Sequence, residues 1–176
     1  LVKGLLNQKL KADICFFILF CINVILFNGL SINMPNIPAN FKSTVEAAFS
    51  GTLFIGNSVI SIGDGAFNGC SFTNGLYVNM PTIPEDFIDI IGGEYGGTLS
   101  LGYSVVTIGE SAFEGCSGFT GSLTIPNSVT TIGKSAFYGC SGFTGSLTIP
   151  NSVTTIDQYA FYGCLGFTGS LTIGNS

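Results

Sequence analysis

The feature that most constrains this chain is a repeat of 24 residues. Residues 121–144 and 145–168 differ at only four positions, and residues 97–120 and 51–74 carry the same unit with more substitutions. A unit this short cannot bury an apolar face by itself, so each copy must stack on its neighbours. The sequence therefore predicts a linear repeat solenoid without an interior domain boundary.

Two shorter units of 22 residues alternate with the first two plain copies. They begin GLSINMPNIPANF at Gly29 and GLYVNMPTIPEDF at Gly75. We divide the array, residues 28–176, into units at 29–50, 51–74, 75–96, 97–120, 121–144 and 145–168, with a partial unit at 169–176. This partial copy predicts a fragment of a longer array, in which Phe161, Cys164 and Phe167 lack a covering neighbour.

Within one plain unit, the apolar spacing predicts three short elements. Residues 123–125 alternate apolar and polar side chains, which predicts a strand that ends at Pro126 because proline has no N–H for the ladder. Residues 129–132 predict a second short strand. Residues 135–140 predict a single helical turn, with its inward side chains at Ala136, Phe137 and Cys140.

Hydroxyl side chains recur at the outward positions of the predicted long strands. They form two columns on either side of the inward Leu, and together they are the best candidate ligand surface. Such a surface suits glycans, other proteins or ice, although Ser and Thr also simply favour exposed strand positions. The candidate residues on this face are Thr52, Phe54, Thr98, Ser100, Ser122, Thr124, Ser146 and Thr148.

The repeated unit resembles the BspA-like leucine-rich repeats of surface proteins in anaerobic bacteria and some parasitic protozoa. The matching positions in one copy are Leu123, Ile125, Pro126, Val129, Ile132, Ala136, Phe137 and Cys140. The resemblance implies a right-handed, mostly β coil of short parallel strands and single helical turns. It also implies extracellular or cell-surface display, adhesion or protein binding, and no catalytic residues. Gly56, Gly102 and Gly174 depart from the pattern at the position of Pro126, which leaves the local curvature open.

The composition excludes several classes of function. The chain has no His and no Arg, and only 9% of its residues are charged. Nucleic-acid binding requires many cations, and a Ser-His-Asp triad or a His-ligated zinc site requires His. We therefore expect no nucleic-acid partner, and together with the family resemblance we expect no enzyme and no cofactor. The expected partner is a protein or glycan on a host or neighbouring cell; the alternative is a carbohydrate-binding or docking arm of a polysaccharide-active enzyme.

Two groups of side chains invite a chemical interpretation. Cys70, Cys116, Cys140 and Cys164 recur in one register and could form disulfides or a thiolate ladder, but that position favours buried core thiols. Glu85, Asp86, Asp89 and Glu94 form an acidic cluster that could bind calcium or act in catalysis. It lacks the spacing of a calcium loop, so a solvated loop is the favoured interpretation.

The first 27 residues differ from the array. Lys3, Lys9 and Lys11 precede the apolar run 14–27. A helix of this run would rise about 21 Å, short of the roughly 30 Å hydrocarbon layer, so we predict a signal peptide or a membrane anchor. A buried N-terminal capping element and a misassembled upstream stretch stay open as alternatives.

Overall fold

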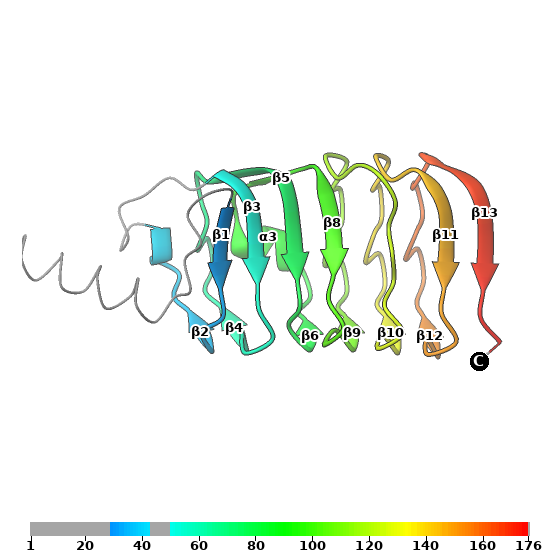
Figure 1. The fold of residues 1–176 in the computed structure, drawn as a ribbon, viewed down its shortest axis with the longest axis horizontal. Helices are drawn as coiled ribbons and strands as arrows, with labels where there is room; N and C mark the ends of the chain where they lie inside the picture. The colour runs from blue at the N-terminus through cyan, green and yellow to red at the C-terminus, as the bar shows by residue number, and fades with distance from the viewer. Residues whose placement is uncertain (1–28, 43–49, 176) are drawn as a thin grey trace, which may run out of the picture.

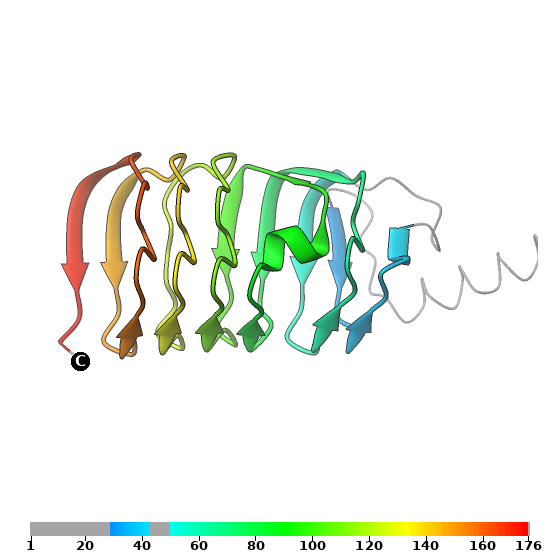
Figure 2. The ribbon, with the colours of Figure 1, turned by 180° about the vertical axis from the view of Figure 1, so that it is seen from behind.

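The computed structural model describes residues 29–42 and 50–175. The chain winds into a parallel β-solenoid whose long strands line one side (Figure 1) and whose turns line the opposite side (Figure 2). The long strands are β1 (Gly29–Ile32), β3 (Ser50–Ile55), β5 (Ser71–Val78), β8 (Thr98–Leu101), β11 (Gly145–Ile149) and β13 (Phe167–Ile173). The predicted fold class, a leucine-rich-repeat coil that is mostly β, is confirmed.

A second ladder of two-residue strands follows one edge of the solenoid (Figure 1). Its members are β2 (Asn36–Ile37), β4 (Ser61–Ile62), β6 (Thr82–Ile83), β9 (Thr107–Ile108), β10 (Thr131–Ile132) and β12 (Thr155–Ile156). β6, β9, β10 and β12 form one continuous sheet, whereas β2 pairs with β4 separately. A further short strand, β7 (Glu94–Tyr95), pairs with the start of β5.

The register of the long strands places like residues on like residues. Leu53 pairs with Leu30 on one side and Leu76 on the other, and Leu76 pairs with Leu99. All four leucines are at most 2% exposed. The alternate residues of these strands therefore point away from the core, as their period of two predicts.

The long-strand sheet is interrupted at one predicted strand. Residues 122–125 follow the path between β8 and β11 but are not part of a strand. In the strands that do pair, the residue after the strand closes the ladder: the N–H of Gly102 donates to Val78 O at 2.8 Å and that of Gly174 to Ile149 O at 2.9 Å. Pro126 follows residues 122–125 and Pro150 follows β11, so each stands where this N–H would be. Proline has no N–H to donate, and the ladder is therefore not closed on either side of residues 122–125.

The predicted helical turn at 135–140 is a series of hydrogen-bonded turns rather than a helix. Ser135 and Gly139 have φ values of 53° and 70°, outside the α-helical region. Their N–H groups, with that of Phe137, donate to carbonyls of the next coil at 2.8–2.9 Å. These amides thus join neighbouring coils instead of closing helical turns. A helix, α3 (Phe87–Ile91), lies instead in a 22-residue unit.

Two columns of stacked phenylalanines fill the C-terminal half of the core. Phe137 stacks between Phe113 and Phe161, with ring centroids 5.3 Å apart on both sides. It also makes an edge-to-face contact at 6.3 Å with Phe143, which belongs to the second column. Ala136, Phe137 and Cys140 are fully buried, so their predicted inward orientation is confirmed.

The last coil exposes apolar side chains that the preceding coils bury. Leu171 and Ile173 in β13 are 62% and 61% exposed, whereas their partners Leu147 and Ile149 are at most 6% exposed. Three further side chains near this end are half-buried and pack against the core: Phe161, Cys164 and Phe167. Among the described strands, β13 pairs only with β11.

The predicted signal peptide or anchor at 1–27 lies outside the described residues. Within the part that the structure describes, no helix combines the length and apolar character needed to cross a bilayer.

Candidate ligand-binding face

The long strands and residues 122–125 present one outward surface, which we call the front face. Seven of the eight candidate residues on it are exposed: Phe54, Thr98, Ser100, Ser122, Thr124, Ser146 and Thr148. Thr52 is half-buried. The alternation that buries Leu and Ile thus leaves this row of hydroxyls facing solvent.

Strand pairing brings some of these candidates together. Thr52 and Thr98 lie on either side of Gly75, and Phe54 is separated from Ser100 by one intervening residue. Thr148 pairs with Thr172 in the last strand. Ser122 and Thr124 lie in the interrupted part of the sheet and have no paired partner there.

The intervening residue is Tyr77, which the sequence analysis missed. It pairs with Phe54, and the two rings lie 5.9 Å apart at an interplanar angle of 42°. The ring reaches across to the next coil, because a Cβ on Gly102 would lie 2.6 Å from Tyr77 Oη. Alignment of GLYV with TLFI already places Tyr77 at the position of Phe54, so the signal was present in the sequence.

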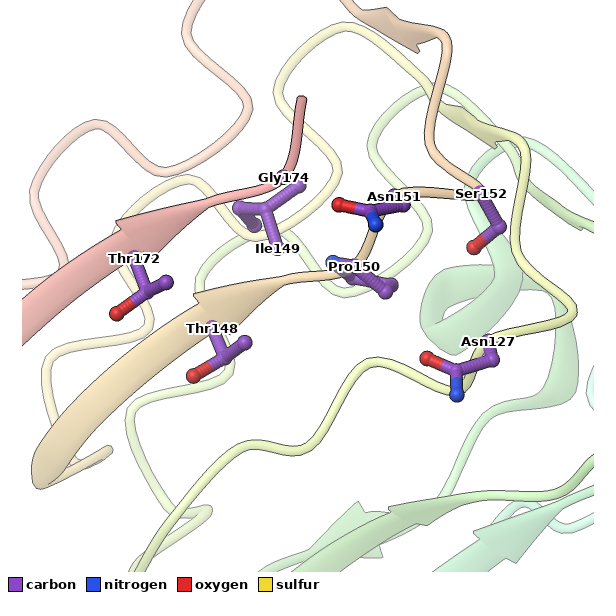
Figure 3. A pocket seen from close by; sticks show the side chains of 8 residues that line it. All are labelled: Asn127, Thr148, Ile149, Pro150, Asn151, Ser152, Thr172 and Gly174. Carbon is purple, nitrogen blue, oxygen red and sulfur yellow. The ribbon is translucent and has the colours of Figure 1, made fainter. Parts of the chain in front are cut away.

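A pocket of about 380 Å³ opens at the C-terminal end of the front face. Figure 3 shows Thr148 and Thr172 on neighbouring strands, with Pro150 between the amide side chains of Asn127 and Asn151. The Oδ1 of Asn151 accepts the N–H of Asn175 at 3.0 Å, which leaves its NH₂ group available. The pocket therefore combines hydroxyls, amides and a proline ring without a charged group.

The front-face side chains that pair across the long strands are uncharged: Thr52, Phe54, Tyr77, Thr98, Ser100, Thr148 and Thr172. An ion pair between Lys134 and Glu110, 2.8 Å apart, joins two successive turns on the opposite side. The hydrogen bond to Glu110 raises the pKa of Lys134. A ligand on the front face would thus meet donors and acceptors but no fixed charge.

The acidic residues Glu85, Asp86, Asp89 and Glu94 do not assemble a metal site. In the described part of the chain, no group of three or more His, Cys, Asp or Glu side chains lies close enough to hold an ion. Asp89 lies within α3, whereas Glu94 lies in β7 and accepts a hydrogen bond from Ser71 Oγ at 3.1 Å.

The cysteines lie in the core or at its margin. Cys70 and Cys140 are buried, whereas Cys116 and Cys164 are half-buried, and all four are free thiols. The Cys140 thiol donates to Phe113 O at 3.0 Å. Burial raises the pKa of Cys116 to about 12 and raises that of Cys140 as well. The thiols of Cys116 and Cys140 therefore stay protonated at neutral pH, which makes them weak nucleophiles and weak metal ligands.

A second exposed aromatic group lies on the turn side, where the sequence analysis placed no site. Tyr138 and Tyr162 stack at 5.2 Å with an interplanar angle of 16°, and Tyr159 meets Tyr162 edge to face at 5.9 Å. Tyr162 and Tyr159 are 61% and 58% exposed, and Tyr138 is 38% exposed. This group therefore forms a second exposed aromatic surface, separate from the front face.

Comparison with known proteins gives one family. The model of the BspA type leucine rich repeat region matches residues 20–86 and 97–175, in six copies. No curated protein and no solved structure matches the chain. The family match covers most of the sequence and agrees with the coil geometry, in which each repeat forms one turn of the solenoid. The chain therefore belongs to the BspA-type leucine-rich repeat family.

Proposed function

We propose that this chain is a binding module, displayed on a cell surface or secreted, that mediates adhesion or protein–protein interaction through its front face. The observation that carries the proposal is the row of exposed hydroxyls from Thr98 to Thr148, which lies on strands whose inward side chains form the buried core. Proteins of this repeat family are typically surface-associated binding scaffolds. The partner is a protein or glycan of a host or neighbouring cell.

Adhesion of protein-coated beads to cultured epithelial cells and to bacterial cells tests this proposal. Charged side chains placed on the front face, as Ser100→Lys together with Thr148→Lys, should abolish adhesion because they introduce uncompensated cations into a neutral contact. The matched control is Ser117→Lys with Ser141→Lys, two exposed positions in the turns. Equal adhesion by the front-face variant and the wild type would refute the assignment of this face.

The location is part of the same proposal. A signal or anchor at 1–27, with membrane attachment through 14–27, would deliver the array to the cell exterior. Fusion of residues 1–27 to a reporter that works only after export should give an active reporter. A reporter retained in the cytoplasm would contradict this part of the proposal without affecting the binding face.

A second candidate function is that of a carbohydrate-docking arm for a polysaccharide-active enzyme. The uncharged pocket beside Thr148 and the aromatic pair Phe54–Tyr77 favour it. A catalytic domain encoded in the same gene as the array would support the docking arm, and a surface-anchoring tail would support adhesion.

A further inference from the structure

We propose that the ligand of the front face is a neutral glycan chain that crosses the strands along the axis of the solenoid. One sugar ring stacks on Phe54 and Tyr77, and a later one enters the pocket beside Thr148. This inference rests on the proposed function, because it takes the front face as the binding face and names the chemistry of its ligand.

The aromatic pair supplies the stacking surface. Phe54 is 42% exposed and Tyr77 is half-buried, and their rings lie on adjacent strands. Since Tyr77 Oη reaches the position above Gly102, this ring is laid across the sheet instead of standing upright from it. A ring in this orientation offers its π face to the C–H groups of a pyranose, as flat apolar contacts require.

Beyond the aromatic pair, the equivalent positions of the following strands carry hydroxyl side chains. Tyr77 pairs with Ser100, and after the interrupted coil the column resumes at Thr148 and Thr172. Adjacent strands lie about 4.8 Å apart, which is close to the repeat of an extended polysaccharide. Each Ser or Thr hydroxyl can donate and accept, so it matches sugar hydroxyls in either sense. A glycan laid along the axis would therefore meet hydroxyls at Ser100, Thr148 and Thr172.

The pocket provides a second anchor at the end of the column. Its volume of about 380 Å³ exceeds the space that one sugar ring needs. Asn127 and Asn151 border it with amide groups, and Thr148 and Thr172 border it with hydroxyls around the Pro150 ring (Figure 3). Small-molecule sites typically combine an apolar wall with a few convergent polar groups in this way.

The absence of positive charge on the front face favours neutral sugars over acidic ones. The paired columns carry no cation, and the whole chain has a formal net charge of −5. Acidic polysaccharides would be repelled by this net charge and would find no Lys or Arg on the face. Neutral polymers avoid both penalties, so we infer that they are preferred.

The test measures binding of the full chain to hexasaccharides of four neutral polymers, namely β-glucan, xylan, mannan and chitin, and to an acidic oligogalacturonate. Isothermal titration should show that at least one neutral member binds and that the acidic one does not. Phe54→Ala with Tyr77→Ala should weaken that binding about tenfold or more. The matched control is Tyr138→Ala with Tyr162→Ala, the exposed pair on the turn side, which should bind as the wild type does.

A second variant tests the proposal even if the double variant at Phe54 and Tyr77 fails to fold. Thr148→Val removes one hydroxyl at nearly constant volume and should weaken binding several-fold at an unchanged melting temperature. Adhesion in the cell assay with binding to none of the neutral hexasaccharides would overturn the glycan inference and leave the proposed function standing. Adhesion that survives removal of cell-surface glycans by glycosidases would assign a protein partner. Retained adhesion by the front-face Lys variant would instead reject the proposed function itself.

Discussion

The side chain of Asn79 lies over Gly102 of the next coil, where a Cβ would overlap the Asn79 amide. Asn79 Oδ1 accepts the N–H of Ser104 at 2.8 Å. The corner from Val78 to Ile83 is two residues shorter than the corner that follows it. The asparagine side chain therefore satisfies a backbone group of the longer corner and requires glycine beneath it. The same arrangement joins Asn33 to Ser58 above Gly56.

This relationship predicts coupling between two substitutions. Asn79→Ala should lower the free energy of unfolding by about 1 kcal/mol, because it leaves the Ser104 N–H without its acceptor. Gly102→Ala should cost about 1–3 kcal/mol through overlap with the amide. Urea denaturation of the double variant should show less loss than the sum of the two single losses. If the two single losses simply add in the double variant, the contact between Asn79 and Gly102 is contradicted. The control is Asn57→Ala, at an exposed turn.

A second prediction concerns the stacked phenylalanines. Phe137→Ala should destabilise the array by about 3–5 kcal/mol, because it empties a fully buried site between two stacked rings. Phe161→Ala should cost clearly less, since Phe161 is half-buried. Equal losses in denaturation experiments would show that the last coil is as well covered as the middle ones.

The buried thiols predict a dependence of stability on pH. The pKa of Cys116 is raised from 9.0 to about 12, and that of Cys140 is also raised, both chiefly by burial. The unfolded chain therefore loses these protons at lower pH than the folded chain does. The contribution of these thiols to the free energy of unfolding should stay constant below about pH 9 and fall as the pH rises above it. Cys140→Ala should reduce the slope between pH 9 and 11, and an unchanged slope would contradict this account.

The same burial predicts slow chemistry at the thiols. Reductant should leave the melting temperature unchanged, and native labelling should be slow but complete on denaturation. Cys140→Ser should cost about 1–3 kcal/mol, because a hydroxyl replaces an apolar sulfur in the core. A disulfide between any two of Cys70, Cys116, Cys140 and Cys164, detected by mass spectrometry, would refute the prediction.

The gap in the long-strand sheet predicts the effect of restoring an amide. Pro150→Ala keeps the Cβ and adds an N–H opposite Ile125, at the position where Gly174 closes the next ladder. The new amide should exchange with solvent more slowly than the amide of Asn151, measured by NMR in the same variant. Equally fast exchange at both amides would show that the missing N–H is not what interrupts the sheet.

Several features of the fold were predictable from sequence because they depend on local periodicity. The inward Leu30, Leu53, Leu76 and Leu99 follow from a period of two, and the burial of Phe137 and Cys140 follows from their repeated positions. The exposed candidates from Thr98 to Thr148 follow from the same alternation. The prediction of a helical turn at 135–140 was wrong, because alternate amides of this segment bond to the next coil and local sequence does not show that contact.

The sequence by itself determined a stacked, charge-poor coil with a hydroxyl-bearing face, because the repeat and its alternation specify which side chains must be buried together. The tertiary structure alone decided where the sheet breaks, that Tyr77 crosses to Gly102, and that a pocket forms around Pro150. These features depend on which backbone and side-chain groups of one coil face those of the next. For Tyr77 and Gly102, that alignment depends on the corner lengths, which differ between the 22- and 24-residue units.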